Sequence, residues 1–402
     1  MIRHAVDTPL VEARHQKRAR VMQSVQAIIP LLRSHAAETE DNRRLSDAVA
    51  EVLVGTGLHR AYQPARFGGH ELDFAFQVEL GAALGHGCAS AAWCGVFFAQ
   101  HPLVVGMMLP EAQDDVWRNT PDTLIANAFF TPGSQCTVVD DGYVLNGTWI
   151  ISSGVDHCGW NNLNVMVTQV DGPPEHRFML VPKSDYRILD DWRATGLAGT
   201  GSNSIVLSNV FVPAYRTLRT LDCRGGPTPG SAANDSYLYR LPLMATFPVG
   251  PATIAPGISG GILEAIYDGM KTRQSAAGMR IADLPTAHLR LSEAGAIIDA
   301  ARALMQQDCT EIDTMGAAGE IPSLTRRAAY RRDWAYAVEM CRRAAEMLLP
   351  LQGAKGLAAG NLAQRLWRDI HAVSAHAALT WDIQGQHQAR ARLQLDLLDP
   401  RI

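Results

Sequence analysis

The spacing of apolar residues changes twice along the chain, from a helical period to short alternating runs and back. Up to about residue 120, apolar positions recur every three or four residues, which predicts helices over 11–34, 45–58 and 73–108. Residues 64–69 contain proline and two glycines and are expected to form a turn. Because residues 82–108 contain many glycines and alanines, we expect the helices there to pack closely.

Short runs with β-branched residues and alternating polarity dominate the middle of the chain. They predict the strands of an antiparallel sheet or barrel, over residues 124–130, 136–139, 143–151, 163–170, 178–181 and 204–212. Residues 225–236 are rich in glycine, proline, serine and asparagine and are expected to form a linker. The helical period then returns and predicts a C-terminal bundle, with helices over 258–273, 285–315, 324–351 and 361–397.

Three segments of different character therefore follow one another in a chain of 402 residues, a length that can hold two or three domains. The expected fold class is α+β and mostly α. We expect an N-terminal helical domain over 1–121, a central antiparallel β-barrel or sandwich domain over 122–222, and a C-terminal four-helix bundle within 223–402.

The composition is that of a soluble globular protein, with 47% hydrophobic and 19% charged residues. The net charge of −4, with lysine and arginine scattered along the chain, offers no field that would attract a nucleic acid. We see neither a secretory signal nor an uninterrupted apolar run of spanning length, so no membrane contact is expected. Seven cysteines without a CxxC pair are typical of reduced thiols and predict a cytoplasmic protein without a metal site.

Residues 147–160 are the most informative segment, a predicted strand that ends in a Ser-Ser-Gly turn. Taken alone, such a turn most often reflects local hydrogen bonding to the backbone. The functional interpretation is that the strand end presents the hydroxyls of Ser152 and Ser153 to a flat heterocycle, with Trp149 and Trp160 as apolar walls. This segment by itself leaves both interpretations open.

Two histidines lie in apolar helical stretches. His376 is flanked by Ala375 and Ala377, which leave room for a ligand, although a helical histidine is ordinarily a packed core or surface residue. His101 precedes a proline and either caps the end of a helix or faces a pocket. The glycine-rich segment 193–204 is no phosphate loop, because it lacks the Lys-Ser/Thr of a P-loop and opens a strand instead of a helix.

Taken together and in order, several motifs resemble those of the flavin-dependent monooxygenases of the acyl-CoA dehydrogenase fold. These enzymes are the oxygenase components of two-component systems such as p-hydroxyphenylacetate hydroxylase. The motifs are Phe67-Gly-Gly69, residues 127–133, residues 147–160, residues 196–204 with Val212-Pro213, residues 352–357, and Arg368-Asp369 with His376. The resemblance spans nearly the whole chain.

One departure separates this sequence from the dehydrogenases of the same fold. Those enzymes remove an α-proton with a glutamate that commonly follows an Arg-Asp pair by about nine residues. Residues 374–378 read Ser-Ala-His-Ala-Ala here and contain no carboxylate. Oxidation of a CoA thioester remains an alternative, since some dehydrogenases carry the glutamate on another helix, and a non-catalytic scaffold that binds no flavin is a further alternative.

By resemblance, reduced FMN or FAD from a separate NAD(P)H-dependent flavin reductase would react with O₂, and the resulting C4a-hydroperoxyflavin would hydroxylate an aromatic or polycyclic small molecule. His376 would stabilise the peroxide, and Ser153 or Ser152 would contact flavin N5. His101 would orient the substrate. Arg273, together with the loop that begins at Gln352, resembles the pair with which dehydrogenases reach the FAD of a neighbouring subunit, so a homotetramer is expected.

The resemblance thus assigns catalytic roles to His376, Ser153 and His101. The cofactor contacts it implies are Asn127, Phe130, Thr131, Trp149, Ser152, Ser153, Thr200, Ser202, Arg273, Gln352, Gly353 and His376. The substrate contacts it implies are Trp93, His101, Tyr239, Arg240 and Trp381.

Overall fold

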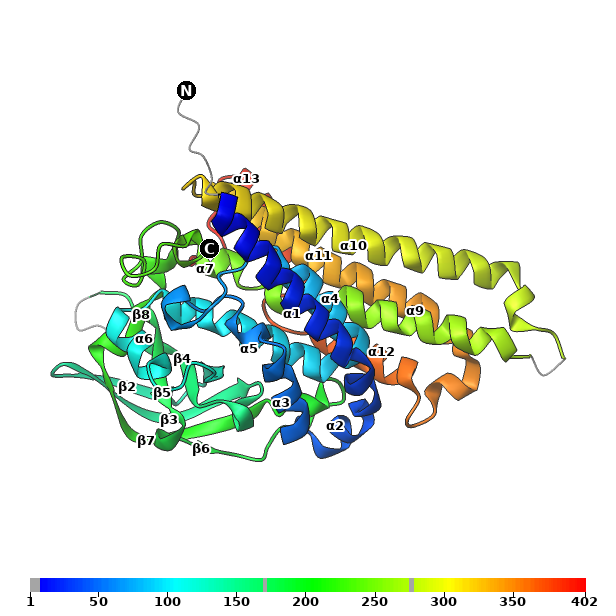
Figure 1. The fold of residues 1–402 in the computed structure, drawn as a ribbon, viewed down its shortest axis with the longest axis horizontal. Helices are drawn as coiled ribbons and strands as arrows, with labels where there is room; N and C mark the ends of the chain where they lie inside the picture. The colour runs from blue at the N-terminus through cyan, green and yellow to red at the C-terminus, as the bar shows by residue number, and fades with distance from the viewer. Residues whose placement is uncertain (1–7, 169–171, 275–277) are drawn as a thin grey trace, which may run out of the picture.

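Helices, strands and helices follow one another in three blocks along the chain (Figure 1). The computed structural model describes residues 8–168, 172–274 and 278–402, with side chains from residue 14 onward except at position 130. The first block holds α1 (Thr8–Ser34), α2 (Ala36–Asn42), α3 (Asp47–Gly55), α4 (Phe76–Gly87), α5 (Ala89–Gly106) and α6 (Pro110–Trp117). The last block holds α7 (Leu243–Thr246), α8 (Val249–Ala252), α9 (Ile254–Thr272), α10 (Pro285–Ala317), α11 (Leu324–Leu348), α12 (Leu362–Ser374) and α13 (Trp381–Arg392).

The middle block is one twisted sheet. Its strands are β1 (Ile125–Phe130), β2 (Gln135–Val139), β3 (Gly142–Ser152), β4 (Trp160–Val167), β5 (Glu175–Pro182), β6 (Arg187–Ile188), β7 (Asn203–Pro213) and β8 (Thr217–Arg219). Their order is β6-β7-β3-β1-β4-β5-β8, with β2 on β3. Among the described strands, β1 and β4 pair in parallel and the other pairs are antiparallel, so the sheet is mixed where an antiparallel one was expected. The expected strand over 163–170 ends outside the described residues, which stop at 168.

Helix α5 forms the centre of the molecule and is buried along its whole length, which explains why it is apolar on every face. Glycines bring its neighbours α4 and α9 into backbone contact. A Cβ atom at Gly85 would lie 2.5 Å from the carbonyl oxygen of Ile254, and one at Gly257 would lie 2.2 Å from that of Ala82. Any larger residue at either position would force the helices apart. The close packing expected for residues 82–108 is therefore found at the α4–α9 contact.

The C-terminal helices pack side by side, with α10 along α11 and both next to α9 (Figure 1). The expected single helix over 361–397 is broken: α12 ends at Ser374, a turn follows, and α13 begins at Trp381. The expected linker over 225–236 is also packed into the molecule. Within it, the Gly230 N–H donates to the carbonyl of Met107, so this segment covers the end of α5.

One helical stretch of the described residues, Leu243–Thr272, is long and apolar enough to cross a membrane by length and composition, with a mean hydropathy of 1.2. This differs from the expectation that polar residues interrupt every such run. Of the apolar window, 78% is buried inside the protein, as in a core helix of a soluble fold. The division into domains at residues 121 and 222 stays a prediction.

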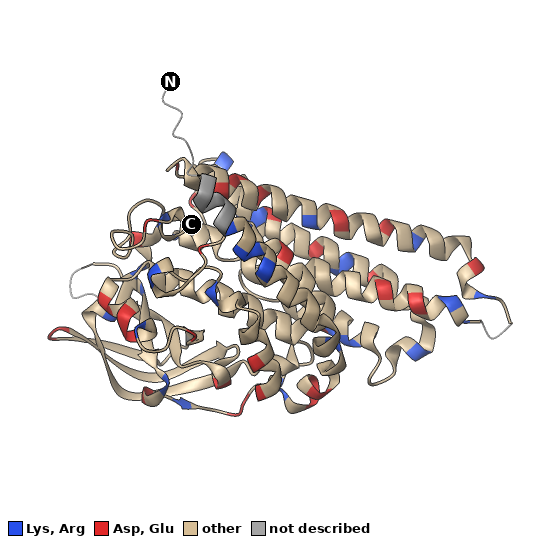
Figure 2. Cartoon of the chain, viewed as in Figure 1, with Lys and Arg blue, Asp and Glu red and all other residues tan. Residues whose placement is uncertain are grey.

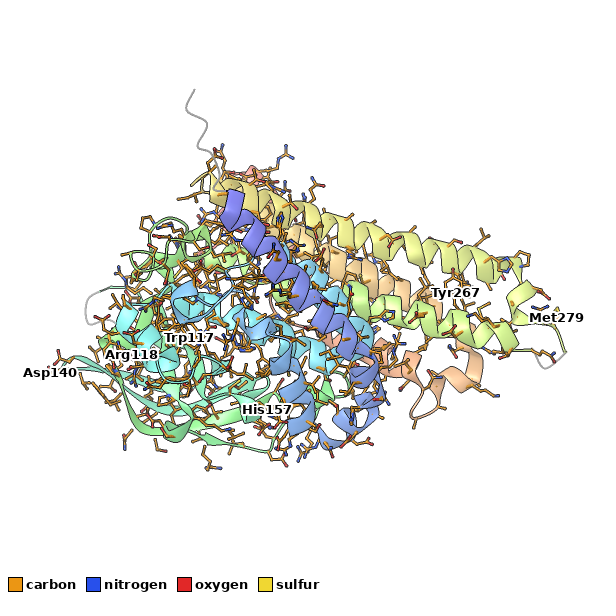
Figure 3. The ribbon with its side chains drawn as sticks, viewed as in Figure 1. Trp117, Arg118, Asp140, His157, Tyr267 and Met279 are labelled. Carbon is orange, nitrogen blue, oxygen red and sulfur yellow. The ribbon has the colours of Figure 1, made fainter. Side chains whose placement is uncertain are left out.

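Charged side chains of both signs are interspersed over the helices and strands that Figure 2 draws. The long axis of the molecule runs from Asp140, at the tip of the β2–β3 hairpin, to Met279 beyond the end of α9 (Figure 3). Tyr267 lies on α9 in the part of the bundle that extends towards Met279. The bundle end is thus remote from the outer edge of the sheet.

Candidate active site

A cavity of about 1010 Å³ lies between the sheet and the helices. Its walls come from segments far apart in the sequence, namely α5, strands β1, β3, β4 and β5, the turn after α12, and α13. Since ligand pockets usually measure about 300–1,000 Å³, this cavity lies at the upper end of the range for small-molecule sites. Five residues predicted from the sequence line it together: Trp93, His101, Asn127, Ser153 and His376.

A bulge at the end of β3 decides which of the two serines faces the cavity. The pairing of β3 with β7 slips between Trp149 and Ser152, and Ile151 adopts a φ of 59°, a conformation that is strained for a β-branched residue. Ser152 turns into the sheet, where its Oγ accepts a hydrogen bond of 2.7 Å from Asn161 Nδ2. Ser153 comes next and lines the cavity. Of the two serines, Ser153 is the one placed to meet a ligand.

The Ser153 hydroxyl is held by neighbours on two sides. Trp93 Nε1 donates a hydrogen bond of 2.9 Å to Ser153 Oγ. Ser202 Oγ lies 2.7 Å from the same oxygen. Because Ser153 is 5% exposed, these contacts fix its position against the cavity wall.

His376 lies in the turn between α12 and α13, not within a helix as expected. Its Nδ1 accepts the backbone N–H of Ala378 at 3.3 Å, which places the ring proton on Nε2. The edges of Trp93 and Phe129 pack against the imidazole, with ring centroids at 5.5 and 6.4 Å. Burial, and then the nearby Arg331 guanidinium, lower the pKa of His376 to about 4. At neutral pH the ring is therefore an uncharged hydrogen-bond donor on the cavity wall.

The turn that carries His376 is tied to helix α11 through one glutamine. Gln384 Nε2 donates to the carbonyl of Ala377 at 2.8 Å, so this carbonyl is satisfied without a helical partner. Gln384 Oε1 accepts from Arg331 Nε and Nη2 at 3.1 and 2.8 Å. Arg331 Nη1 in turn donates to the carbonyl of Met244 at 2.7 Å. These tertiary contacts override the helical propensity of the alanine-rich segment.

His101 presents the opposite hydrogen-bonding character to the cavity. Its Nδ1 lies 2.6 Å from the carbonyl oxygen of Ile125, which can only accept, so Nδ1 carries the proton and Nε2 is left as an acceptor. The ring is stacked between Phe97 and Phe247, with centroids at 5.0 and 6.0 Å. Burial lowers the pKa of His101 to about 4. Such a weak base accepts a hydrogen bond more readily than it removes a proton.

Asn127 reaches the cavity from β1, and its amide packs against those of Asn162 and Asn164 on β4. Thr131, also predicted to contact the cofactor, is hydrogen-bonded through Oγ1 to the carbonyl of Thr148 at 2.9 Å. Phe130 ends β1, and its side chain lies outside what the structure describes.

Other residues predicted for the site lie away from the cavity lining. Trp149 is fully buried in the sheet and donates from Nε1 to the Asn164 carbonyl at 3.0 Å. Tyr239 is buried against Tyr62, its OH donating to that residue's carbonyl at 3.2 Å. Arg240 Nη1 donates to the carbonyl of Asp235 at 2.9 Å, and Trp381 packs against Tyr336. None of these four appears among the described residues that line the cavity, although Tyr239, Arg240 and Trp381 were expected to contact the substrate.

Arg273, Gln352 and Gly353 lie together at the far end of the bundle, outside the cavity lining. Arg273 Nη1 donates to the carbonyl of Leu351, and a Cβ atom at Gly353 would lie 2.5 Å from Arg273 Nη2. Arg273 and this loop thus contact each other within one chain, and their contact with the cofactor stays a prediction.

Several residues that line the cavity were not predicted from the sequence, above all Arg331, Gln384 and His387. Arg331 lies on α11 and is far in sequence from α13, so only the folded chain joins them. Both ring nitrogens of His387 are buried without a hydrogen-bond partner in the described part of the chain, and burial lowers its pKa. The signal that could have found His387 is its spacing from Gln384, which puts both on one helical face.

The carboxylates that line the cavity, within the described residues, are already paired. Glu175 Oε1 bonds Arg177 Nε, and Asp399 Oδ1 lies 2.7 Å from Arg401 Nε. Neither is in position as a free base beside His376. A large cavity lined by a neutral imidazole, without a free carboxylate beside it among the described residues, fits an oxygenase of the acyl-CoA dehydrogenase fold better than a dehydrogenase.

Comparison with known proteins agrees with this class. Residues 249–381 match the family described as Acyl-CoA dehydrogenase, C-terminal domain. The chain is 34% identical over 395 residues to the FADH(2)-dependent resorcinol hydroxylase, oxygenase component, of Rhizobium sp. (strain MTP-10005), with 96% of each chain covered. It is 30% identical over 378 residues to the p-hydroxyphenylacetate 3-hydroxylase, oxygenase component, of Acinetobacter baumannii, covering 94% of this chain and 89% of that one.

A solved structure gives the same result in three dimensions. The HsaA monooxygenase from M. tuberculosis superposes with a TM-score of 0.90 at 31% identity and covers 96% of this chain and 100% of its own. The chain belongs to the flavin-dependent monooxygenases of the acyl-CoA dehydrogenase fold, as an oxygenase component. The family resemblance and the fold class inferred from the sequence are confirmed.

Proposed function

We propose that the protein binds reduced FMN or FAD in the large cavity and uses O₂ to hydroxylate an aromatic or polycyclic small molecule. One observation carries this proposal: Ser153 and His376, from distant parts of the sequence, line the same cavity of about 1010 Å³. Reduced flavin, when bound, would activate O₂. The residues fit such a group, since Ser153 and Asn127 line the cavity from the sheet, His376 lines it from the turn after α12, and Trp93 of α5 contacts both Ser153 and His376.

His376 would act as a neutral donor towards the oxygen-bearing position of the flavin. The low pKa of its ring keeps Nε2–H in place without adding a positive charge to the cavity. Trp93 and Phe129 pack beside the ring and cover part of it. We assign His376, Ser153 and His101 the catalytic roles, and Asn127 a cofactor contact.

The substrate would lie beside His101 in the cavity. His101 Nε2 accepts a hydrogen bond, which suits a phenolic hydroxyl, and its weak basicity favours orientation over deprotonation. The aromatic walls formed by Phe97 and Phe247 match a flat ring.

A separate NAD(P)H-dependent flavin reductase would supply the reduced flavin, as expected for an oxygenase component such as the resorcinol hydroxylase relative. We also propose that the protein is a cytoplasmic homotetramer without nucleic-acid or membrane partners. Exposed apolar side chains near the bundle end support an interface there, since they would otherwise face water; they are Tyr267, Met279, Leu289 and Leu357.

The test is to mix the protein anaerobically with reduced FMN or FAD, admit O₂ and follow the absorbance. A near-ultraviolet absorbance that outlasts the oxidation of free flavin by at least about tenfold is expected. Bleaching of bound oxidised flavin by an acyl-CoA without a reductase would instead favour the dehydrogenase alternative. Failure to bind either flavin in either redox state would favour the scaffold alternative.

A further inference from the structure

The hydroxyl of Ser153 begins a chain of three buried hydroxyls that ends on a backbone carbonyl. Ser153 Oγ lies 2.7 Å from Ser202 Oγ, which lies 2.6 Å from Thr200 Oγ1. Thr200 Oγ1 lies 2.8 Å from the carbonyl oxygen of Leu197. Ser202 is 3% exposed and Thr200 is 1% exposed, so bulk water does not compete for these bonds.

The order of these three hydroxyls fixes which one donates in each hydrogen bond. A carbonyl oxygen can only accept, so the Thr200 hydroxyl donates its proton to Leu197. Each hydroxyl has one proton, so Thr200 has none left and Ser202 must donate to it. For the same reason Ser202 has none left for Ser153, and Ser153 must donate to Ser202.

The carbonyl at the end of the chain is held rigidly. The Leu197 carbonyl oxygen also accepts the Trp192 Nε1–H at 3.1 Å. It accepts the Thr200 backbone N–H at 3.2 Å as well. The Leu197 N–H, in the preceding peptide unit, donates to Asp369 Oδ1 at 2.7 Å, which ties Leu197 to α12, the helix that precedes His376. These contacts hold the acceptor carbonyl in place.

Ser153 Oγ therefore presents a lone pair to the cavity, and its proton points away from the cavity. Its proton points to Ser202, and one of its two lone pairs already accepts the Trp93 Nε1–H. One acceptor site remains on Ser153 Oγ. A ligand atom that meets it must bring a proton of its own.

We propose that Ser202 and Thr200 are positioning residues that make Ser153 an obligatory hydrogen-bond acceptor, so that the cavity discriminates between flavins by the protonation of N5. Reduced flavin carries a proton on N5 and satisfies Ser153, whereas oxidised flavin places a bare lone pair against another lone pair. This inference rests on the proposed function. It also changes the expectation for Thr200 and Ser202, whose hydroxyls act through Ser153 and not on the cofactor.

Thr200→Val is the sharpest test, because it removes the hydroxyl at nearly constant shape and leaves Leu197 with its Trp192 donor. Ser202 can then donate to Ser153, which frees the Ser153 proton for oxidised N5. We expect oxidised flavin to bind about tenfold more tightly, with less than about a twofold change for reduced flavin. The two-electron midpoint potential of the bound flavin would fall by about 30 mV.

Ser202→Ala provides a second route to the same change, since Ser153 then loses the group to which it donates. Thr200→Ser is the matched control, because it keeps the hydroxyl and should keep the affinity ratio of the native protein. All forms are compared by equilibrium titration with oxidised flavin and by anaerobic titration with reduced flavin, which require no turnover.

A gain of affinity for oxidised flavin in Thr200→Val and Ser202→Ala, but not in Thr200→Ser, supports the inference. It is overturned if both hydroxyl-free variants fold and keep the ratio of the native protein, or if Thr200→Ser changes the ratio as much as Thr200→Val. If the native protein binds neither redox form, the proposed function itself fails and this inference fails with it.

Discussion

At the residue scale, two neutral imidazoles of opposite hydrogen-bonding character face one cavity. His376 offers a proton from Nε2 because its Nδ1 accepts a backbone N–H, and His101 offers a lone pair because its Nδ1 is bonded to a carbonyl. Backbone groups alone set this difference. Each ring is therefore suited to a different partner, His376 to an oxygen acceptor and His101 to a hydroxyl donor.

We predict that His376→Ala leaves the affinity for reduced flavin within about threefold but lowers the coupling of O₂ consumption to hydroxylation. Loss of one buried donor costs about 1–3 kcal/mol, so more H₂O₂ should be released, by about tenfold or more. The measurement is H₂O₂ and product formed per O₂ consumed. His371→Ala is the control, since His371 lies outside the cavity lining with Nδ1 2.7 Å from the Trp367 carbonyl oxygen. Unchanged coupling in His376→Ala would remove this residue from the chemistry.

The stability of the fold should depend on pH through His101. Its folded pKa of about 4 is below the ordinary value of 6.5, so the unfolded chain binds more protons between these values and stability falls as pH falls. His101→Asn removes this titration. The native protein should therefore lose about 2 kcal/mol relative to the variant between pH 7 and pH 5. Urea unfolding at both pH values checks this, and a difference independent of pH would contradict it.

The sequence identified two of the cavity histidines, His101 and His376, but not their surroundings and not His387. His101, Ser153 and His376 each lie in a short segment that stands out in the sequence alone. The orientation of each ring depends on backbone groups such as Ile125 O and Ala378 N, and no residue pattern encodes these. The choice between Ser152 and Ser153 depends on the bulge at Ile151, a position where the sequence shows no glycine to announce a positive φ.

At the element scale, the broken helix is the feature that the periodicity could not reveal. Residues 374–380 contain no proline or glycine, so the helical pattern continues through them. The break arises because the Ala377 carbonyl bonds Gln384, which Arg331 holds from α11. Most strand and helix positions depend on local periodicity and were predictable, although the break between α4 and α5 and the short strands β6 and β8 were not. The turn after α12 depends on a contact between helices.

Gln384→Met should weaken that turn. The substitution keeps the length of the side chain but leaves Nε and Nη2 of the buried Arg331 without their acceptor and the Ala377 carbonyl without its donor, at a cost of about 3 kcal/mol. Urea unfolding would show a lower midpoint with an unchanged slope. Gln386→Met, on the exposed side of the same helix, should change stability by less than about 0.5 kcal/mol. Equal effects at both positions would contradict the role of Gln384.

At the scale of the whole molecule, Arg273 and the Gln352–Gly353 loop lie outside the cavity although the family resemblance links them to the flavin. The proposed homotetramer would reconcile the two by placing the bundle end of one subunit at the cavity of another.

Hybrid assemblies test this arrangement. Arg273→Ala and His376→Ala subunits should each be nearly inactive alone, and co-expression should restore activity to about a quarter of the native level by random pairing. Activity is measured on assemblies whose mass is confirmed by light scattering. Ser153→Ala combined with His376→Ala should show no such recovery, because both residues line one cavity. If the Arg273→Ala and His376→Ala mixture does not recover activity, Arg273 acts on the cavity of its own subunit.

The glycine contact between α4 and α9 joins the first and last helical blocks of the chain backbone to backbone. Neither block has a finished surface without the other, so a gene cut between them should yield insoluble fragments that regain solubility only when produced together. Protein engineers who wish to graft the flavin cavity onto another scaffold would have to carry both helices as a pair.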